Sequence, residues 1–127
     1  MTTAIRVLVV DDEPSIRNSL VEFLEDCQFD VLAADSAENA LDLITRVPID
    51  VTIVDIRLPD LDGDSLIAEA HRLRPPMRYL IHTGSVAYKL SDTLKAVGIA
   101  AEHVLTKPQT NLSVFKDAIL TLTAYGP

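Results

Sequence analysis

The residues of this chain that could do chemistry follow short runs of apolar residues. Asp11 and Asp12 come directly after the first run, and Asp55 comes directly after the third. Thr83 and Lys107 follow the fourth and fifth runs. Ligands of open parallel α/β sheets bind outside the carboxyl ends of the strands. If these runs are strands of one sheet, one of its edges gathers carboxylates, a hydroxyl and an ammonium.

Carboxylates held close together need a cation or a proton to offset their repulsion. Two of them about 4 Å apart repel by roughly 4 kcal/mol at an effective dielectric constant of 20. Oxygen ligands without His or Cys favour Mg²⁺, Mn²⁺ or Ca²⁺ over zinc, and Mg²⁺ commonly combines carboxylates with water and phosphate oxygens. With a Lys and a hydroxyl nearby, such a site suits phosphoryl transfer, in which one carboxylate becomes an aspartyl-phosphate.

Each of these residues has a simpler interpretation when it is taken alone. An Asp after a strand can cap the next helix, so Asp11 or Asp12 by itself indicates little. Asp55, or Thr83 before a glycine, could merely begin a turn. Lys107 could be solvated. The combination of these side chains at four strand ends is what favours a site for phosphoryl transfer.

The elements that must position these side chains alternate between strand and helix patterns. The predicted strands are residues 5–10, 31–34, 51–54, 79–81 and 104–106. Several of them are rich in Val and Ile, as in parallel strands that are covered on both faces. The segments between and after them carry apolar residues at helical spacing, beginning with Ile16, Leu20, Phe23, Leu24 and Cys27.

Residues that begin or end helices set the expected boundaries. Ser36 is a good N-cap for the second helix, and the third begins near Asp64 and stops at Pro75-Pro76. Gly98 favours a left-handed cap after the fourth helix. This alternation of strands and helices predicts one α/β domain, with a parallel sheet, right-handed crossovers and helices on both faces.

Composition excludes several classes of protein. The chain has 127 residues with 19 acidic and 11 basic side chains, a net charge of −8, which argues against direct binding of nucleic acid. A single cysteine, Cys27, excludes an internal disulfide. No apolar run approaches the length of a membrane span, and the first residues do not resemble a signal peptide. We therefore expect a cytoplasmic protein that does not bind membranes.

Four segments of the chain resemble the signature segments of one family. They are VLVVDDEP at 7–14, DIRLPDLDG at 55–63, Thr83-Gly84 and Lys107-Pro108. They are similar to the receiver domains of bacterial two-component response regulators, of the chemotaxis-regulator type, and the similarity covers almost the whole chain. It implies a flavodoxin-like (βα)₅ fold with strand order 2-1-3-4-5. We expect residues 1–127 to form one receiver domain, without an output domain.

The resemblance also implies a metal site and a phosphoacceptor. Asp55 would accept a phosphoryl group from a phosphohistidine on a sensor kinase or a phosphotransfer protein. Asp11 and Asp12 would form an acidic pair, with Asp12 binding Mg²⁺ directly and Asp11 acting partly through water. The backbone carbonyl of Arg57 would complete the protein ligands of the metal, for which Mn²⁺ could substitute.

Further residues would contact the phosphoryl group. By the same resemblance, Lys107 would pair with Asp55 and then with the phosphoryl group, and the Thr83 hydroxyl would bond a phosphoryl oxygen. The Lys107-Pro108 peptide bond would be cis. The domain would be a signalling module and not an enzyme, limited to self-phosphorylation and autodephosphorylation. Phosphorylation would switch the binding of an output protein or of a fused output domain, or would lead to a dimer with a second copy.

One position departs from the family pattern. Three residues before Lys107, where the family has an aromatic residue coupled to the Thr, this chain has Val104. A valine cannot make the inward swing of an aromatic ring, so the output relay is expected to be altered. Tyr88 and His103 lie near this position in the sequence and are the candidates to replace the aromatic residue.

Three other functions are compatible with parts of this pattern. A phosphatase of the haloacid-dehalogenase type also uses an Asp nucleophile and Mg²⁺, but it needs an acidic residue where this chain has Arg57. A flavin- or nucleotide-binding module would need a phosphate-binding first turn, which the acidic residues at 11–13 disfavour. A protein-binding module that works without phosphorylation stays open because of Val104.

Overall fold

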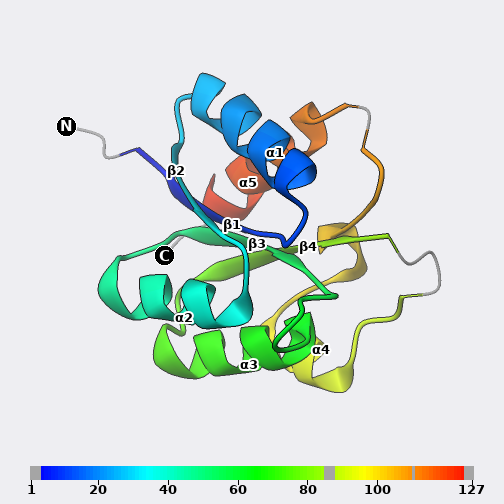
Figure 1. Cartoon of the computed structure of the whole chain (residues 1–127). Helices are drawn as coiled ribbons and strands as arrows, with labels where there is room; N and C mark the ends of the chain where they lie inside the picture. The colour runs from blue at the N-terminus through cyan, green and yellow to red at the C-terminus, as the bar shows by residue number, and fades with distance from the viewer. Residues whose placement is uncertain (1–3, 85–87, 110, 125–127) are drawn as a thin grey trace.

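The computed structural model describes residues 4–84, 88–109 and 111–124, which form a parallel sheet covered by helices (Figure 1). The strands are β1 (Arg6–Val10), β2 (Asp30–Ala34), β3 (Val51–Asp55), β4 (Arg78–Thr83) and β5 (Val104–Thr106). The helices are α1 (Pro14–Asp26), α2 (Ala37–Arg46), α3 (Gly63–Leu73), α4 (Asp92–Val97) and α5 (Ser113–Ala124), and a 3₁₀ turn, η1 (Ala101–His103), precedes β5.

The order of the strands is β2-β1-β3-β4-β5, and the pairings between neighbours are parallel. The helices α1 and α5 cover one face of the sheet, and α2, α3 and α4 cover the other (Figure 1). The predicted flavodoxin-like fold is thus confirmed. Because β1 and β3 are neighbours and their connections leave on opposite faces, their carboxyl ends form the crevice in which such sheets bind ligands.

The central strands are buried on both faces because successive residues point into different apolar layers. In β1, Val7 and Val9 join a cluster that includes Leu20 of α1 and Phe115 of α5. Leu8 and Val10 join the cluster on the other face, with residues of α2, α3 and α4. This two-sided burial explains why the strands read as continuous apolar runs.

Most of the expected helix boundaries are confirmed. The Ser36 side chain accepts a hydrogen bond from the backbone N–H of Asn39 at 3.1 Å. Gly98 has φ of 104° and ends α4 in the left-handed conformation. The start of α3 lies at Gly63, one residue before Asp64, because the Asp62 side chain caps this helix.

The region before β5 differs most from a simple reading of the sequence. The α4 helix spans only 6 residues, and η1 lies between it and β5. In this turn, His103 Nδ1 accepts a hydrogen bond from the backbone N–H of Ala100 at 3.0 Å. The histidine therefore closes its own turn, a local contact that hydrophobic spacing does not reveal.

The side chain of Asp60 connects the loop after β3 to the start of α2. Asp60 accepts hydrogen bonds from the backbone N–H groups of Ala37 and Glu38, at 3.0 and 2.9 Å. These N–H groups lie at the start of α2, and the two bonds hold the pKa of Asp60 below its usual value. The contact anchors the segment that directly follows Asp55.

Gly63 lies where a side chain has no room, which gives a testable prediction. A Cβ atom there would lie 2.9 Å from the Cα of Ile56 and 3.1 Å from the carbonyl oxygen of Asp55. We expect Gly63→Ala to lower the free energy of unfolding by about 2 kcal/mol, because backbone must shift. Gly84→Ala is the control, since a Cβ there meets nothing within 4 Å. Urea unfolding that gives the two variants equal stability would contradict this close packing.

Candidate functional site

The carboxyl ends of the strands bring together acidic residues from two neighbouring strands. Asp11 directly follows β1, and Asp55 is the last residue of β3. Their side chains are buried, with residue exposures of 2% and 5%, whereas Asp12 is exposed. One carboxylate oxygen from each of these three residues lies within 4.8 Å of the others. The predicted acidic cluster therefore forms.

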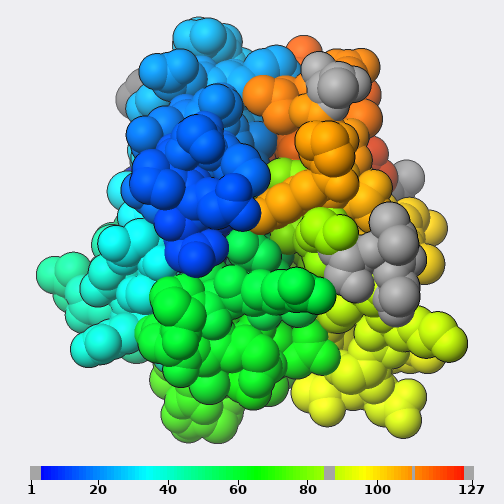
Figure 2. Space-filling model, turned by 45° about the vertical axis from the view of Figure 1, so that its right-hand side comes forward, coloured from blue at the N-terminus to red at the C-terminus, as the bar shows by residue number. Residues whose placement is uncertain are grey.

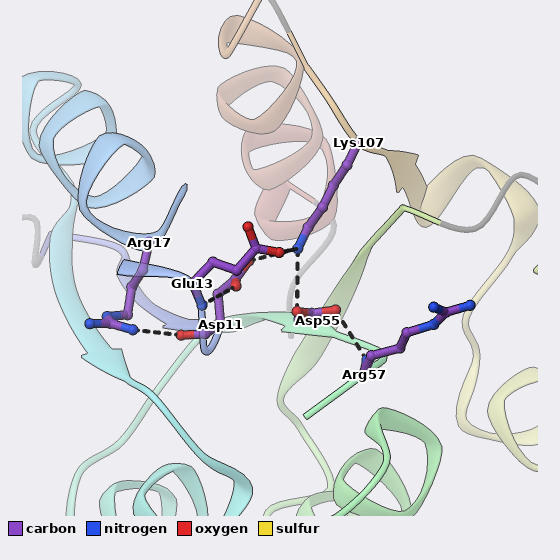
Figure 3. A network of polar contacts seen from close by, with 6 residues as sticks. All are labelled: Asp11, Glu13, Arg17, Asp55, Arg57 and Lys107. Carbon is purple, nitrogen blue, oxygen red and sulfur yellow. Dashed lines mark hydrogen bonds and ion pairs between the residues drawn. The ribbon is translucent and has the colours of Figure 1, made fainter. Parts of the chain in front are cut away.

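Lys107 places its ammonium between the two buried carboxylates. Its Nζ lies 3.0 Å from Asp11 Oδ2 and 3.2 Å from Asp55 Oδ2 (Figure 3). Glu13 Oε1 is also near, at 3.9 Å. Lys107 follows the short strand β5, and its backbone N–H donates to the Thr83 carbonyl at 2.7 Å. The Lys107-Pro108 peptide bond is cis.

Backbone hydrogen bonds hold the remaining oxygens of both carboxylates. Asp11 Oδ1 accepts from the backbone N–H of Glu13 at 2.9 Å, and Asp55 Oδ1 accepts from that of Arg57 at 3.1 Å. Arg17, one turn into α1, donates to the Asp11 carbonyl at 2.8 Å. Each buried carboxylate thus has one oxygen on the local backbone and the other on Lys107 (Figure 3).

Burial and the neighbouring charges together set the pKa values of this cluster. Burial raises the pKa of Asp55, the Arg57 N–H and Lys107 lower it, Asp11 raises it again, and the result lies above the usual value. Burial alone would lower the pKa of Lys107, but the carboxylates of Asp11 and Asp55 raise it above its usual value. One ammonium faces three carboxylates, so a second positive charge fits here.

The donor set matches a hard divalent cation. The clustered ligand atoms are carboxylate oxygens, which suit Mg²⁺ or Mn²⁺, and the described residues bring no His or Cys into the group. Asp12 is exposed and keeps the site open to solvent, which suits an ion that retains water ligands. The residues present therefore fit the metal that the sequence predicts.

The other residues singled out in the sequence lie around this cluster. Thr83 is buried at the carboxyl end of β4, where it pairs with Thr106 of β5. Arg57 is exposed, and its guanidinium extends away from Asp55 (Figure 3). Glu13 and Arg17 were not predicted to contact the cluster. Their contacts depend on how α1 starts, which residue types alone do not give.

Tyr88, in the segment after β4, makes a contact that is relevant to the aromatic residue missing at position 104. Tyr88 donates a hydrogen bond from its hydroxyl to Asp64 Oδ1 at 3.0 Å, at the start of α3. Tyr88 and Val104 both pack against the same apolar cluster. Tyr88 thus links the segment after β4 to the helix that follows the phosphoacceptor candidate. A relay role for Tyr88 or for His103 stays a prediction.

His82, beside Asp55 in the sheet, gives a prediction on pH. Burial, followed by the charge of Lys107, lowers its pKa from 6.5 to about 4. The unfolded chain then binds the proton more tightly than the folded one between these values. The histidine's contribution is fully present above pH 6.5 and is lost as the pH falls toward 4.

We expect this loss to reach about 3 kcal/mol, which is the linkage limit for a shift of that size. The measurement is urea unfolding of the wild type and of His82→Phe between pH 7 and pH 4.5. The stability of the wild type relative to the variant should decrease as the pH is lowered. The comparison cancels the opposite effect of Asp55, whose raised pKa favours the folded state at lower pH. If the difference in unfolding free energy between the wild type and His82→Phe did not depend on pH, the claim that His82 is buried as a neutral imidazole would be wrong.

Comparisons with known proteins agree with this geometry. Residues 7–119 match the model of the response regulator receiver domain. Response regulator GtcR of Aneurinibacillus migulanus is 33% identical over 102 residues, covering 80% of this chain and 41% of that protein. The chain therefore spans less than half the length of this relative.

Solved structures show the same fold over nearly the whole chain. A CheY-like receiver domain protein from Methanospirillum hungatei JF-1 has a TM-score of 0.83 and 29% identity, covering 98% of this chain and 100% of that one. The response regulator TrrA from Thermotoga maritima, in complex with Mg²⁺-BeF, has a TM-score of 0.80 and 26% identity, covering 93% and 98%.

The fold and the acidic site at its carboxyl edge define a receiver domain. The chain belongs to the response regulator receiver domain family. Its function is that of a receiver in two-component signal transduction, and the family is one of signalling domains. Over the described ranges, the helices are too short or too polar to cross a membrane.

Proposed function

We propose that this receiver accepts a phosphoryl group on Asp55 from a phosphohistidine of a sensor kinase or a phosphotransfer protein. The observation that carries the proposal is the position of Lys107 Nζ, 3.2 Å from Asp55 and 3.0 Å from Asp11. A buried carboxylate next to a cation and a second carboxylate can act as a nucleophile and keep counter-charge nearby.

Asp11, Asp12 and Asp55 would hold Mg²⁺ together with the backbone carbonyl of Arg57. When bound, Mg²⁺ or Mn²⁺ would offset the negative charge of the carboxylates and of the phosphoryl oxygens. The clustering of the three carboxylates supports this ligand set. The related regulator TrrA was crystallised with Mg²⁺-BeF, which is consistent with such a site in this fold.

In the proposed transfer, a carboxylate oxygen of Asp55 attacks the phosphorus of the phosphohistidine. The O–P bond forms as the N–P bond breaks, and the electron pair of that bond returns to the imidazole nitrogen of the donor. The ammonium of Lys107 exchanges its bond to Asp55 for one to the phosphoryl group. The hydroxyl of Thr83, at the end of the adjacent strand, contacts another phosphoryl oxygen.

The consequences of transfer are also part of the proposal. Phosphorylation changes the binding of an output protein, of a fused output domain or of a second copy of the chain. The protein works in the cytoplasm and does not turn over free substrates, apart from its own phosphorylation and dephosphorylation. We assign the surface that reads this change to the region of the short α4 helix and of Tyr88, whose hydroxyl donates to Asp64.

The test is intact-protein mass spectrometry after incubation with acetyl phosphate. With Mg²⁺ present, the protein should gain the mass of one phosphoryl group, and an excess of EDTA should prevent this gain. A receiver of known activity serves as the positive control for the reaction conditions. If the control receiver is labelled and this protein is not, this protein is a binding module that works without phosphorylation.

A further inference from the structure

The inference concerns Asp60, an exposed carboxylate in the loop that follows β3. Its Oδ1 accepts a hydrogen bond from the backbone N–H of Ala37 at 3.0 Å, and its Oδ2 accepts one from that of Glu38 at 2.9 Å. Figure 2 shows the green segment that follows β3 at the surface, beside the cyan start of α2. Both oxygens of Asp60 are thus bound to α2, and Asp60 is not one of the clustered carboxylates.

Two side chains cap the start of α2, and they come from different parts of the chain. The first N–H groups of a helix have no partner within the helix. Ser36, the residue before α2, accepts from the N–H of Asn39, whereas Asp60 accepts from the two N–H groups that precede it. Loss of either cap removes partners from α2. Loss of Asp60 also releases the loop after β3, which loss of Ser36 does not.

This loop, residues 56–62, carries a proposed ligand of the metal. The ligand is the backbone carbonyl of Arg57, and the N–H of the same residue donates to Asp55 Oδ1 at 3.1 Å. The loop closes where the N–H of Gly63 donates to the carbonyl of Ile56 at 2.9 Å. The position of the Arg57 carbonyl therefore depends on what holds the loop between its two ends.

Asp60 holds this loop in a way that its apolar side chains do not. Leu58 is buried in the apolar cluster under α2, α3 and α4. Apolar contacts are non-directional, so they keep the loop against the core without fixing its position along the surface. The two hydrogen bonds of Asp60 are directional and end on the backbone of a helix.

A metal ligand that is already in place costs less to bind. Mg²⁺ demands nearly ideal octahedral geometry, and ordering a mobile segment on binding reduces affinity. We propose that Asp60 is a positioning residue, which holds the loop after β3 so that the Arg57 carbonyl is in place before Mg²⁺ binds. The inference rests on the proposed metal site. Asp60 itself contacts neither the metal nor the phosphoryl group and acts through the backbone of the loop.

The first test is calorimetric titration with Mg²⁺ of the wild type, Asp60→Ala and Ser36→Ala. Asp60→Ala should bind Mg²⁺ about fivefold more weakly, a smaller loss than the roughly 10- to 100-fold that follows removal of a group bonded directly to a ligand. Ser36→Ala is the matched control, because it also removes a cap of α2 but leaves the loop attached. Its affinity should stay within about twofold of the wild type.

Asp60→Asn separates the position of the loop from the charge of Asp60. It removes the same negative charge as Asp60→Ala, but its amide oxygen can still accept one of the two hydrogen bonds. We expect it to bind Mg²⁺ only about twofold more weakly than the wild type. Equal losses in Asp60→Asn and Asp60→Ala would mean that charge and not position affects the metal, and would overturn the inference.

A second readout needs no metal. Hydrogen exchange of the Gly63 N–H, which closes the loop on Ile56, reports how often the loop opens. In metal-free protein, this N–H should exchange at least about threefold faster in Asp60→Ala than in the wild type. It should exchange at the wild-type rate in Ser36→Ala. Equal exchange in Asp60→Ala and the wild type would contradict a loop held by Asp60.

The outcomes distinguish this inference from the proposed function. If the wild type binds Mg²⁺ and Asp60→Ala binds it equally well, Asp60 only caps α2, and the inference fails while the metal site stands. The same holds if Ser36→Ala weakens Mg²⁺ binding as much as Asp60→Ala does. If the wild type binds no Mg²⁺, the proposed metal site and the inference fail together.

Discussion

Asp55→Asn is expected to reduce the incorporation of phosphoryl groups from acetyl phosphate by at least about 100-fold. The amide has nearly the shape of the carboxylate but lacks the anionic oxygen that would attack phosphorus. The amide can keep the bond from the Arg57 N–H, which lies 3.1 Å from the carboxylate, so the fold should be preserved. Intact mass spectrometry at a fixed time, with Mg²⁺ present, measures the effect.

A matched control distinguishes the loss of the acceptor from the loss of any negative charge. Asp26 is exposed at the end of α1 and is not one of the clustered carboxylates. Asp26→Asn should incorporate phosphoryl groups as the wild type does. Equal incorporation in Asp55→Asn and in the wild type would place the acceptor at another residue and would remove the basis of the proposed transfer.

Lys107→Met is expected to have two effects of opposite sign. Its ammonium lies between two buried carboxylates, and its removal leaves their repulsion uncompensated. Without metal, the free energy of unfolding should fall by about 3 kcal/mol, because breaking a buried ion pair leaves unpaired charge. The affinity for Mg²⁺ should rise about tenfold, because the ion no longer competes with an ammonium for the same oxygens.

The same variant should nevertheless incorporate phosphoryl groups at least about 100-fold less than the wild type, because the cation that would contact the phosphoryl oxygens is missing. Calorimetric titration with Mg²⁺ and urea unfolding with and without Mg²⁺ measure the first two effects. Lys116→Met, on the exposed side of α5, is the control and should behave as the wild type. Weaker Mg²⁺ binding in Lys107→Met than in the wild type would contradict the claim that the Lys107 ammonium competes with Mg²⁺ for the same oxygens.

Most helices and strands could be predicted because their signals are local and repeated. Each buried strand reads as an apolar run, and helix ends carry recognisable residues such as Ser36 and Gly98. Parallel strands and short connections then leave few topologies open. The order of the strands came from the resemblance to receiver domains, since apolar patterns do not say which strands are neighbours.

The site was predictable only where it depends on strand ends. Asp11, Asp55 and Lys107 follow strands directly, so the topology alone brings them together. Arg17 reaches the Asp11 carbonyl because of where α1 begins and how its side chain turns, which spacing does not fix. The 3₁₀ turn before β5 likewise depends on a bond within the turn, made by His103.

The depth of His82 was not predicted either. In the sequence, His82 is one of three histidines, and nothing in the residues around it indicates its depth. Its burial follows from the length of β4, which extends through Thr83 and turns His82 toward Phe115. The length of a strand depends on its pairing with neighbouring strands. The residues of that strand alone do not show this pairing.

The most direct measurement of the central claim is chemical trapping of the phosphorylated residue. The protein is incubated with acetyl phosphate and Mg²⁺ and then reduced with borohydride, which converts an aspartyl-phosphate to homoserine. Peptide mass spectrometry then locates the modified position. We predict homoserine at position 55 and unmodified aspartate at positions 11 and 12. Homoserine at another aspartate, with position 55 unmodified, would contradict the assignment of Asp55 as the phosphoacceptor.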